Sequence, residues 1–387
     1  MNVKEKTIFD FAIIGAGAAG LNLVMAMLDD PFFKNKSILL LDKDPKVTND
    51  HTWCYWESGK GKWDLIAHKI WEKGFFVSNE VKHQLDMNPY RYKMVRAADF
   101  YSYIKKRLEE APNVKWVHEE VLEVVEEREV VITTPSNAMF ARQVFDSRIA
   151  KEFYQHNDSS IRILQHFKGW VVETEEDFFN PEEFVMMDFR LKWKNSASFT
   201  YVLPSTKRSA LIEFTLFTTE LIEDTSYDAM LIKYCDEILK LKKYKIIEVE
   251  KGVIPMTDFP FHKYNTTKVT KIGTAGSWVK PSSGYSFKNA QKFSEVIIQN
   301  IKKGLKPSKG IANSRHRKYD SIFLGVLKNR NELGEKVFTD MYLKNPASRI
   351  FRFLDEQSTV AEDLKIISSF ESAPFIESLF GMIRKKS

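Results

Sequence analysis

One carboxylate lies inside an otherwise apolar, strand-like segment, ALIEFTLF at residues 210–217. Side chains alternate between the two faces of a strand, so Glu213 shares a face with Leu211 and Phe217. A charge in such a setting is unfavourable unless it is paired, neutralised or used in chemistry. A carboxyl group kept neutral by apolar surroundings can act as a proton donor. Glu213 is therefore the first candidate for acid catalysis.

A second acidic pair follows in LIEDT, residues 221–225. Glu223 and Asp224 stand in a similar-looking frame, but the residues after them are typical of a helix start. We expect Asp224 or Thr225 to cap a helix that begins near Tyr227.

A glycine motif marks a nucleotide site. The turn AGAAG directly follows the apolar strand FDFAIIG and opens a helix, and Asp42 ends the next predicted strand. In this pattern the glycines permit a tight turn, close approach to a pyrophosphate and close helix packing, while the acid accepts hydrogen bonds from a ribose. The acid disfavours NADP here and leaves FAD or NAD. The expected phosphate contacts come from Gly15, Gly17, Ala18, Ala19 and Gly20.

The elements that must position these residues indicate an α/β fold. Strand and helix signals alternate near the N-terminus, period-2 segments follow in the middle, and a glycine loop precedes a helix from about Ser286. We predict a Rossmann-like FAD/NAD(P)-binding domain interleaved with an antiparallel β-sheet substrate domain and a helical C-terminal region. The expected boundaries are 1–75, 91–150 and 265–305 for the nucleotide domain, 76–90 and 151–264 for the β domain, and 306–387 for the helical region.

Composition narrows the function classes. Two cysteines argue against a disulfide framework, and we expect no metal site. The 29 Phe, 14 Tyr and 8 Trp favour either an apolar cavity or simply an aromatic-rich core. The start MNVKEKTIFD lacks the apolar region of a signal peptide, so we expect a cytoplasmic protein. The uncharged stretch at 11–28 is explained by the glycine motif, and no transmembrane helix is predicted.

Positive charge is concentrated late in the chain. The net charge is +6, and residues 302–330 carry nine Lys or Arg side chains against Asp320 alone. Such a region can attract an anionic membrane or nucleic acid, or can simply be a solvated face.

A longer set of motifs carries a resemblance to a known family. NDHTWCYWE at 49–57 follows Asp42, and further matches run in order along the chain: VFDSR at 144–148, QHFKGWVVET at 165–174, MMDFR at 186–190, FTYVLPST at 199–206, LIEFT at 211–215, GVIPMT at 252–257 and GTAGSWVKPSSGYSF at 273–287. Together they resemble the lycopene cyclase family of flavoproteins over about residues 8–300.

The resemblance implies an isomerase that converts the linear ψ-ends of lycopene, or a related carotene, into β-ionone rings. It implies FAD kept reduced by NADPH or NADH, peripheral attachment to the membrane that holds the carotene, and contact with neighbouring carotenoid enzymes. No nucleic-acid partner is expected. The alternatives are a flavin-dependent reductase or monooxygenase of a prenyl or lipid substrate, and a non-catalytic carotenoid-binding flavoprotein.

The resemblance also assigns the acid. Glu213 matches the first glutamate of the family's F-L-E-E-T-like motif, shortly after the YVLP strand, and this register favours it over Glu223. Phe214 stands where the second acid is expected, which weakens any mechanism that needs two adjacent carboxylates. The structural alternative for Glu213 is a buried ion pair with Arg190 or Arg208.

Other residues receive roles by the same resemblance. His51 is expected as a proton relay or a plain hydrogen-bonding group, and Asp188 as a supporting base or a partner of Arg190. The remaining cofactor candidates are Asp42, Arg148, Gly276, Pro281, Gly284 and Tyr285. The substrate candidates are Trp53, Trp56, Phe214 and Phe217.

Overall fold

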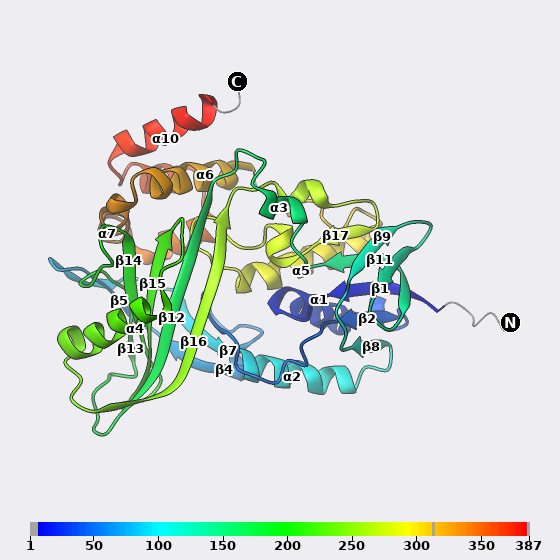
Figure 1. Ribbon diagram of the computed structural model, residues 1–387, viewed down its shortest axis with the longest axis horizontal. Coiled ribbons are helices and arrows are strands. Elements are labelled where there is room, and N and C mark those ends of the chain that lie inside the picture. Colours follow the sequence, from blue (N-terminus) through cyan, green and yellow to red (C-terminus); the bar gives the residue numbers. More distant parts are fainter. Residues whose placement is uncertain (1–6, 312–313, 385–387) are drawn as a thin grey trace.

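The protein is described by a computed structural model over residues 7–311 and 314–384. Residues 1–6 of the expected nucleotide domain and residues 312–313 and 385–387 of the expected C-terminal region lie outside this description. The described chain forms three β-sheets, helices packed against the sheets and a C-terminal group of helices (Figure 1).

The first sheet carries the glycine turn. It runs in the order β8-β2-β1-β11-β10-β9, with β17 also paired to β11. Its strands are β1 (Ile8–Ile14), β2 (Ile38–Leu41), β8 (Val114–Val117), β9 (Glu123–Glu126), β10 (Val130–Thr133), β11 (Ala138–Asp146) and β17 (Val269–Lys271). β1, β2, β8, β11 and β17 pair in parallel, and the central strand β2, with the sequence ILLL, is buried on both faces.

Three helices share one hydrophobic core with the first sheet: α1 (Ala18–Asp29), α2 (Ala97–Glu109) and α5 (Phe287–Lys302). α1 is buried along most of its length because it packs against both the sheet and α5. The stretch that is uncharged over residues 11–28 is therefore a buried strand and helix. In the described part of the chain, no helix combines the length and apolarity needed to cross a membrane.

The second sheet is larger and faces the nucleotide half. Its order is β16-β12-β15-β14-β13-β5-β6. The strands are β5 (Lys73–Val77), β6 (Lys82–Leu85), β12 (Arg162–Thr174), β13 (Glu183–Asp188), β14 (Ala197–Pro204), β15 (Ser209–Thr218) and β16 (Tyr244–Thr257). A small third sheet of β3 (Thr52–Ser58), β7 (Tyr90–Arg96) and β4 (Ala67–Trp71) lies beside it.

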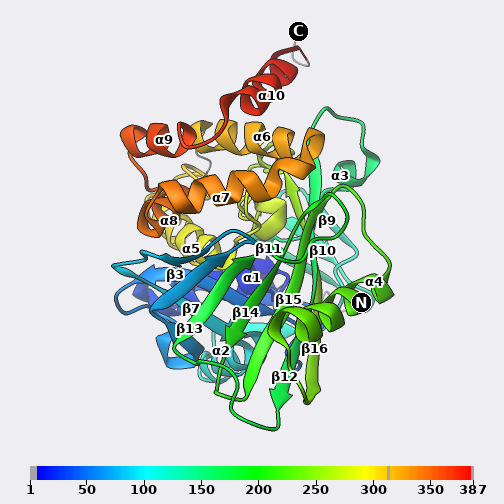
Figure 2. The same ribbon diagram turned by 90° about the vertical axis from the view of Figure 1, so that its left-hand side faces the viewer.

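Helices cover the outer face and one end of the second sheet. α4 (Asp224–Lys233) and the π-helical turn Tyr234–Leu239 lie on the outer face (Figure 2). The C-terminal helices are α6 (Ser314–Asn329), α7 (Gly334–Lys344), α8 (Ala347–Leu354), α9 (Val360–Ile367) and α10 (Ser372–Arg384). Of these, α6 and α10 lie at the top in both views, and the short α3 (Lys151–Gln155) lies near α6.

The start of α4 differs from the sequence expectation. The helix begins at Asp224, with Glu223 at the N-cap position and no capping bond from its side chain, so neither Asp224 nor Thr225 is the cap. The Asp224 carboxylate instead pairs with Lys168 at 2.8 Å and Lys251 at 2.5 Å on neighbouring strands. These two ion pairs stabilise Asp224 in the first turn of the helix, where its negative charge also interacts favourably with the helix dipole.

Candidate active site

A cavity of about 430 Å³ extends from the glycine turn to the inner face of the second sheet. At one end Gly17, Ala18 and Ala19 line it at the start of α1. Gly15 and Gly20 lie behind this turn: a Cβ atom on Gly20 would stand 1.9 Å from the Gly15 carbonyl oxygen. The turn can therefore close only with glycine at position 20, and it presents the helix N-terminus to the cavity.

Asp42 holds the same turn. One carboxylate oxygen accepts a hydrogen bond from the Ala16 N–H at 2.6 Å, and the other accepts one from the Asp44 N–H at 2.8 Å. An ionised carboxylate has further lone pairs, so these bonds leave room for a ribose hydroxyl. Asp42 thus has a structural role that the sequence pattern did not indicate.

The fit of a dinucleotide can be tested on these atoms. A Cβ atom on Gly17 would meet no protein atom within 4 Å, so the space over the turn is open. Lys46, Asp50, Ser147 and Thr274 line the same cavity and supply a cation, an anion and two hydroxyl groups. These groups and the open turn fit the phosphates and hydroxyls of a bound dinucleotide.

The late glycine loop closes the other side of the cavity, where Gly284 and Tyr285 line it. Gly276 and Pro281 lie away from this lining. A Cβ atom on Gly276 would stand 2.5 Å from the Lys271 carbonyl oxygen, and Pro281 lines a neighbouring cavity of about 100 Å³. The geometry gives Gly276 and Pro281 the task of shaping the loop.

Glu213 lines the cavity on the inner face of the second sheet, with a second glutamate beside it. In the strand register, Gly169 of β12 is opposite Glu213 of β15 on one side and Glu250 of β16 on the other. The two carboxyl groups are hydrogen-bonded to each other across this glycine. Tyr201 of β14 is opposite Glu213 and extends the same row.

Burial and the second glutamate decide the protonation of this pair. Burial, the Glu250 charge and the hydrogen bond to Glu250 raise the pKa of Glu213 well above its usual range. The pKa of Glu250 is also raised, chiefly by burial, while its hydrogen bonds to Glu213 and Thr52 oppose the rise. Of the two carboxyl groups, Glu213 therefore has the stronger tendency to be protonated.

The ion pair considered as the alternative for Glu213 is not the arrangement found. Arg190 binds Asp188 at 2.6 Å, and Arg208 approaches Asp177. The polar contacts of Glu213 are instead Glu250 and the Thr215 hydroxyl, which donates to its Oε1 at 3.0 Å.

A second, apolar cavity of about 290 Å³ meets the first at this row. Tyr201, Ser283 and Tyr285 line both cavities. The Tyr285 hydroxyl lies 3.2 Å from that of Tyr92, and burial raises the pKa of Tyr285 to about 12, so it is neutral near pH 7. From this junction the second cavity continues between the sheet and the C-terminal helices, where Phe217 is part of its wall.

Two candidate residues, Phe214 and Asp188, lie on the outer face of the second sheet, away from the cavity. Phe214 is buried on the outer face under α4, because neighbouring residues of a strand point to opposite sides. Asp188 shares that face through its pairing with Thr200, which is opposite Phe214. Its carboxylate is fully buried and binds Arg190 and the Tyr234 hydroxyl, both at 2.6 Å. Neither a substrate role for Phe214 nor a base role for Asp188 fits this geometry.

The aromatic candidates near the motif NDHTWCYWE divide between two sites. Trp53 and His51 line the first cavity and stack on each other, with ring centroids 5.8 Å apart; the His51 side chain is 59% exposed and its Nδ1 lies 3.2 Å from Asp50. Trp56 packs behind Tyr285, with ring centroids 4.5 Å apart, and its indole N–H donates a hydrogen bond to the Asp355 carboxylate at 2.9 Å. Trp53 and His51 therefore face the cavity, whereas Trp56 supports Tyr285 from outside it.

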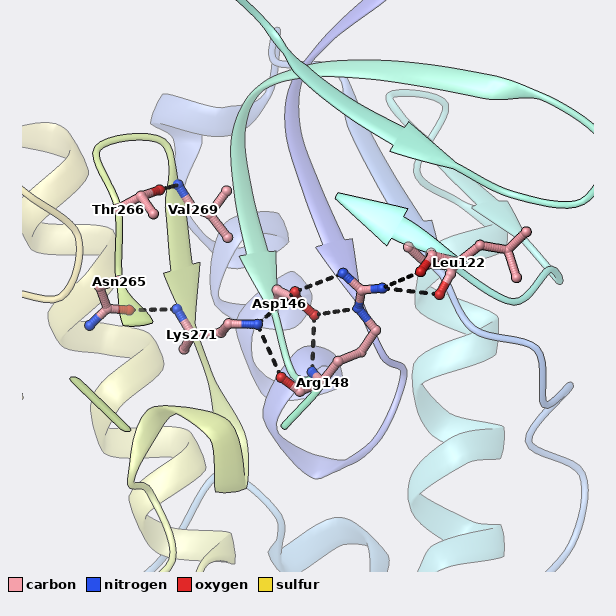
Figure 3. Close-up of polar contacts among 8 residues, drawn as sticks. Leu122, Asp146, Arg148, Asn265, Thr266, Val269 and Lys271 are labelled. Atoms are coloured by element: carbon pink, nitrogen blue, oxygen red, sulfur yellow. Dashed lines mark hydrogen bonds and ion pairs between the residues drawn. The ribbon is translucent and has the colours of Figure 1, made fainter. Parts of the chain in front are cut away.

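Arg148 is bound within the nucleotide half, where it contacts Asp146 (Figure 3), and it does not line the cavity at the glycine turn. Its guanidinium binds both oxygens of Asp146, each at 3.0 Å, and donates to the carbonyls of Val121 and Leu122. Lys271 approaches the same carboxylate at 2.9 Å. Because its donors are occupied, the geometry makes Arg148 a structural tie between β11 and the β8–β9 connection.

Replacing Arg148 by alanine should therefore lower stability without a selective loss of FAD affinity. Burial raises the pKa of Asp146, but Arg148 and Lys271 outweigh it and lower the pKa overall. A carboxyl with a lowered folded pKa stabilises the protein above its unfolded pKa of about 3.9 and loses that effect as pH falls. We expect a loss of about 1–3 kcal/mol at pH 7 that shrinks below about pH 4, measured by urea unfolding. A pH-independent loss would contradict this account.

Comparison with known proteins shows the family of this chain. The model of the family described as lycopene cyclase protein matches residues 10–380. The chain belongs to the lycopene cyclase family. Among curated relatives of this cyclase-family chain, chloroplastic neoxanthin synthases of Solanum tuberosum and Solanum lycopersicum are 25% and 24% identical over 345 residues. Each alignment covers 81% of the chain and 65% of the relative, so the chain spans about two thirds of their length.

Solved structures show the fold of the cyclase-family chain. A geranylgeranyl bacteriochlorophyll reductase-like protein from Thermoplasma acidophilum superposes with a TM-score of 0.59 at 13% identity, covering 98% of this chain and 100% of that one. The flavin-dependent brominase Bmp2 superposes with a TM-score of 0.59 at 15% identity, covering 98% of this chain and 100% of that one. A variant of the halogenase PltM in complex with FAD superposes with a TM-score of 0.60 at 10% identity, covering 97% of this chain and 90% of that one. The predicted fold, a Rossmann-like α/β domain interleaved with an antiparallel β-sheet and followed by helices, is confirmed.

Sequence reasoning missed several residues of the site. Glu250 is the most important, and the signal was present: Glu248, Glu250 and Gly252 alternate in a strand-like segment. Which face these residues occupy depends on the pairing of β16 with β12, and the sequence alone does not set that register. Gly169 and Thr52 were quoted within motifs but received no role.

Proposed function

We propose that this lycopene cyclase family member is a lycopene β-cyclase, which isomerises the linear ψ-ends of lycopene to β-ionone rings. One observation carries the proposal: the buried Glu213 carboxyl, whose pKa is raised by burial and by Glu250, lines the nucleotide cavity beside Tyr201, which also lines the apolar cavity. An alkene is a weak base, so its protonation needs an acid that remains undissociated at neutral pH and is shielded from water.

The proposed reaction conserves atoms. The O–H bond of Glu213 breaks, and the π electrons of the terminal C=C form a new C–H bond and leave a tertiary cation. A second double bond of the chain then supplies the electron pair that closes the ring. Loss of a neighbouring proton, accepted by the carboxylates of the site, forms the ring double bond. No electrons are gained or lost overall.

The walls of the apolar cavity suit a carbocation. Tyr201 and Tyr285 stand at the junction next to Glu213, and their ring faces stabilise positive charge. Beyond them the cavity is lined mainly by Met, Phe, Ile and Leu side chains, which exclude water that would trap the cation. A linear hydrocarbon chain can lie in this cavity with its end group beside Glu213.

The cofactor in the proposal is FAD, held by Gly17, Ala18, Ala19 and the loop at Gly284 and Tyr285. In its reduced form, kept so by NADPH or NADH, FAD supplies electron density that stabilises positive charge developing nearby. The residues of the chain bind it, orient it and keep water from the reacting end of the carotene.

The assay is anaerobic incubation of the purified, FAD-loaded protein with lycopene and NADPH or NADH, followed by mass analysis and chromatography. A cyclised product of the same mass supports the proposal. A product with added hydrogen supports a reductase and one with added oxygen a monooxygenase. Recovery of unchanged lycopene bound to the protein supports a carotenoid-binding role.

We also propose that the C-terminal helices rest on the membrane that dissolves the carotene. Ile367 of α9 and Ile376 and Leu379 of α10 line the apolar cavity and are 38%, 49% and 42% exposed, so the cavity opens on this surface. Leu364 and Phe380 nearby are 59% and 56% exposed. The basic region from 302 to 330 contributes less charge than its sequence suggests, because Lys302, Arg315 and Arg330 bind acids.

A double variant, Leu364→Glu with Phe380→Glu, should reduce co-sedimentation with vesicles of phosphatidylglycerol and phosphatidylcholine by roughly tenfold or more, since two apolar contacts are lost and two negative charges are added. The matched control is Leu122→Glu with Ile247→Glu, which changes two similarly exposed apolar residues elsewhere. Equal losses in both double variants would contradict docking through α9 and α10.

A further inference from the structure

The carboxyl pair has a geometry that neither the family motif nor Glu213 alone explains. Glu213 and Glu250 come from β15 and β16, two strands that do not pair directly but flank β12. They reach each other only over Gly169: a Cβ atom there would stand 3.1 Å from Cγ of Glu250 and 3.3 Å from Cβ of Glu213. Any larger residue at 169 would push between the two side chains.

The hydrogen bonds around the pair are unequal. The Thr52 hydroxyl donates to Oε2 of Glu250 at 2.6 Å, and the Thr215 hydroxyl donates to Oε1 of Glu213 at 3.0 Å. A shorter bond from a donor favours the ionised form of its acceptor. Glu250 is accordingly the anionic member and Glu213 the member that holds the proton.

The other titratable groups facing the pair leave this assignment intact. Cys54 of β3, Tyr92 of β7, Tyr201 of β14 and Tyr285 have pKa values raised chiefly by burial and are neutral at pH 7. On β16 itself, the Glu248 carboxylate binds Asn49 and Arg96, and Lys251 binds Asp224. His51, before β3, partly offsets the rise in the pKa of Glu250.

We propose that Glu250 is a positioning residue that shares one proton with Glu213 across Gly169 and keeps Glu213 in its acid form. The inference rests on the proposed cyclisation for its meaning. During turnover the Glu213 O–H bond breaks as the alkene C–H bond forms, so both carboxylates are briefly anionic beside the cation. When the ring double bond forms, the proton that leaves carbon returns to the pair, whose charge is thereby restored.

The test is Glu250→Gln in the FAD-loaded protein, read in two ways. Removing the neighbouring negative charge lowers the pKa of Glu213, so the basic limb of the pH–kcat profile should move down by about one pH unit or more. The activity at pH 7.5 should fall by roughly tenfold to a hundredfold. Independently of turnover, the carboxylic acid C=O band that disappears in Glu213→Gln should titrate at lower pH in Glu250→Gln, by infrared spectroscopy without carotene.

Controls separate this inference from the proposed function. Glu250→Asp keeps the negative charge, so its pH–kcat profile should shift less than that of Glu250→Gln. Glu223 is exposed, and Glu223→Gln should leave both readouts as in the wild type. If the infrared band shifts as expected but no cyclised product is formed by the wild type, the shared proton stands and the proposed function fails. If the band titrates alike in the wild type and Glu250→Gln, the inference is wrong whatever the activity.

Discussion

Replacing Glu213 by glutamine is expected to lower cyclisation by about 10³-fold, the scale of a lost general acid. Glutamine keeps the size of the side chain and its hydrogen-bonding capacity, but it has no proton acidic enough for an alkene. Because Glu213 lines the cavity on a rigid strand between two paired neighbours, the fold and the FAD site should be unchanged. The measurement is single-turnover conversion of lycopene, with bound FAD quantified by its absorbance.

The control for this prediction is the neighbour that resembles it in sequence. Glu223 is exposed at the N-cap of α4, and α4 lies on the face of the sheet opposite the cavity. Glu223→Gln should retain wild-type conversion. If Glu213→Gln kept more than about a tenth of the activity, general acid catalysis by Glu213 would be ruled out.

Gly17→Val is expected to abolish FAD binding, with affinity lowered about 100-fold or more, while the apoprotein keeps its unfolding midpoint. Gly17 has φ −83° and ψ −170°, a conformation open to any residue, and its Cβ position meets no protein atom within 4 Å. The valine side chain would therefore fill only the space where a pyrophosphate approaches the backbone. Fluorescence titration with FAD measures the loss of affinity, and thermal unfolding of the apoprotein measures the unchanged midpoint.

Gly20→Ala provides the contrast in the same turn. Its Cβ atom would collide with the Gly15 carbonyl oxygen, so the loss should appear first in the stability of the apoprotein. If Gly17→Val unfolded as readily as Gly20→Ala, or bound FAD normally, the assignment of this turn to the dinucleotide would be wrong.

Local signals in the sequence were sufficient for the nucleotide half of the fold. β1, the glycine turn and α1 are contiguous, and their hydrophobic periods and glycine spacing depend on neighbours a few residues away. The start of α4 was placed three residues late because Asp224 pairs with Lys168 and Lys251, which are distant in sequence. Contacts of that kind override capping preferences.

The sequence predicted a site residue only where the local pattern around that residue was enough to identify it. Glu213 stood out as a charge in an apolar strand, but its partner Glu250 arrives through the pairing of two further strands. Phe214 occupies the second acid position of the family motif, but the alternation of a strand places it on the opposite face from Glu213. Arg148 matched a motif, yet its guanidinium is occupied by Asp146, and only the folded arrangement reveals this.

The most direct test of acid-catalysed cyclisation at Glu213 is the mass of the product formed in D₂O. The Glu213 carboxyl exchanges with solvent between turnovers, so each ring closed should replace one carbon-bound hydrogen by one deuterium. We expect β-carotene-type product with one deuterium per ring, and essentially none of it from Glu213→Gln. A product without deuterium, or one that has gained two hydrogens or an oxygen atom, would contradict the account.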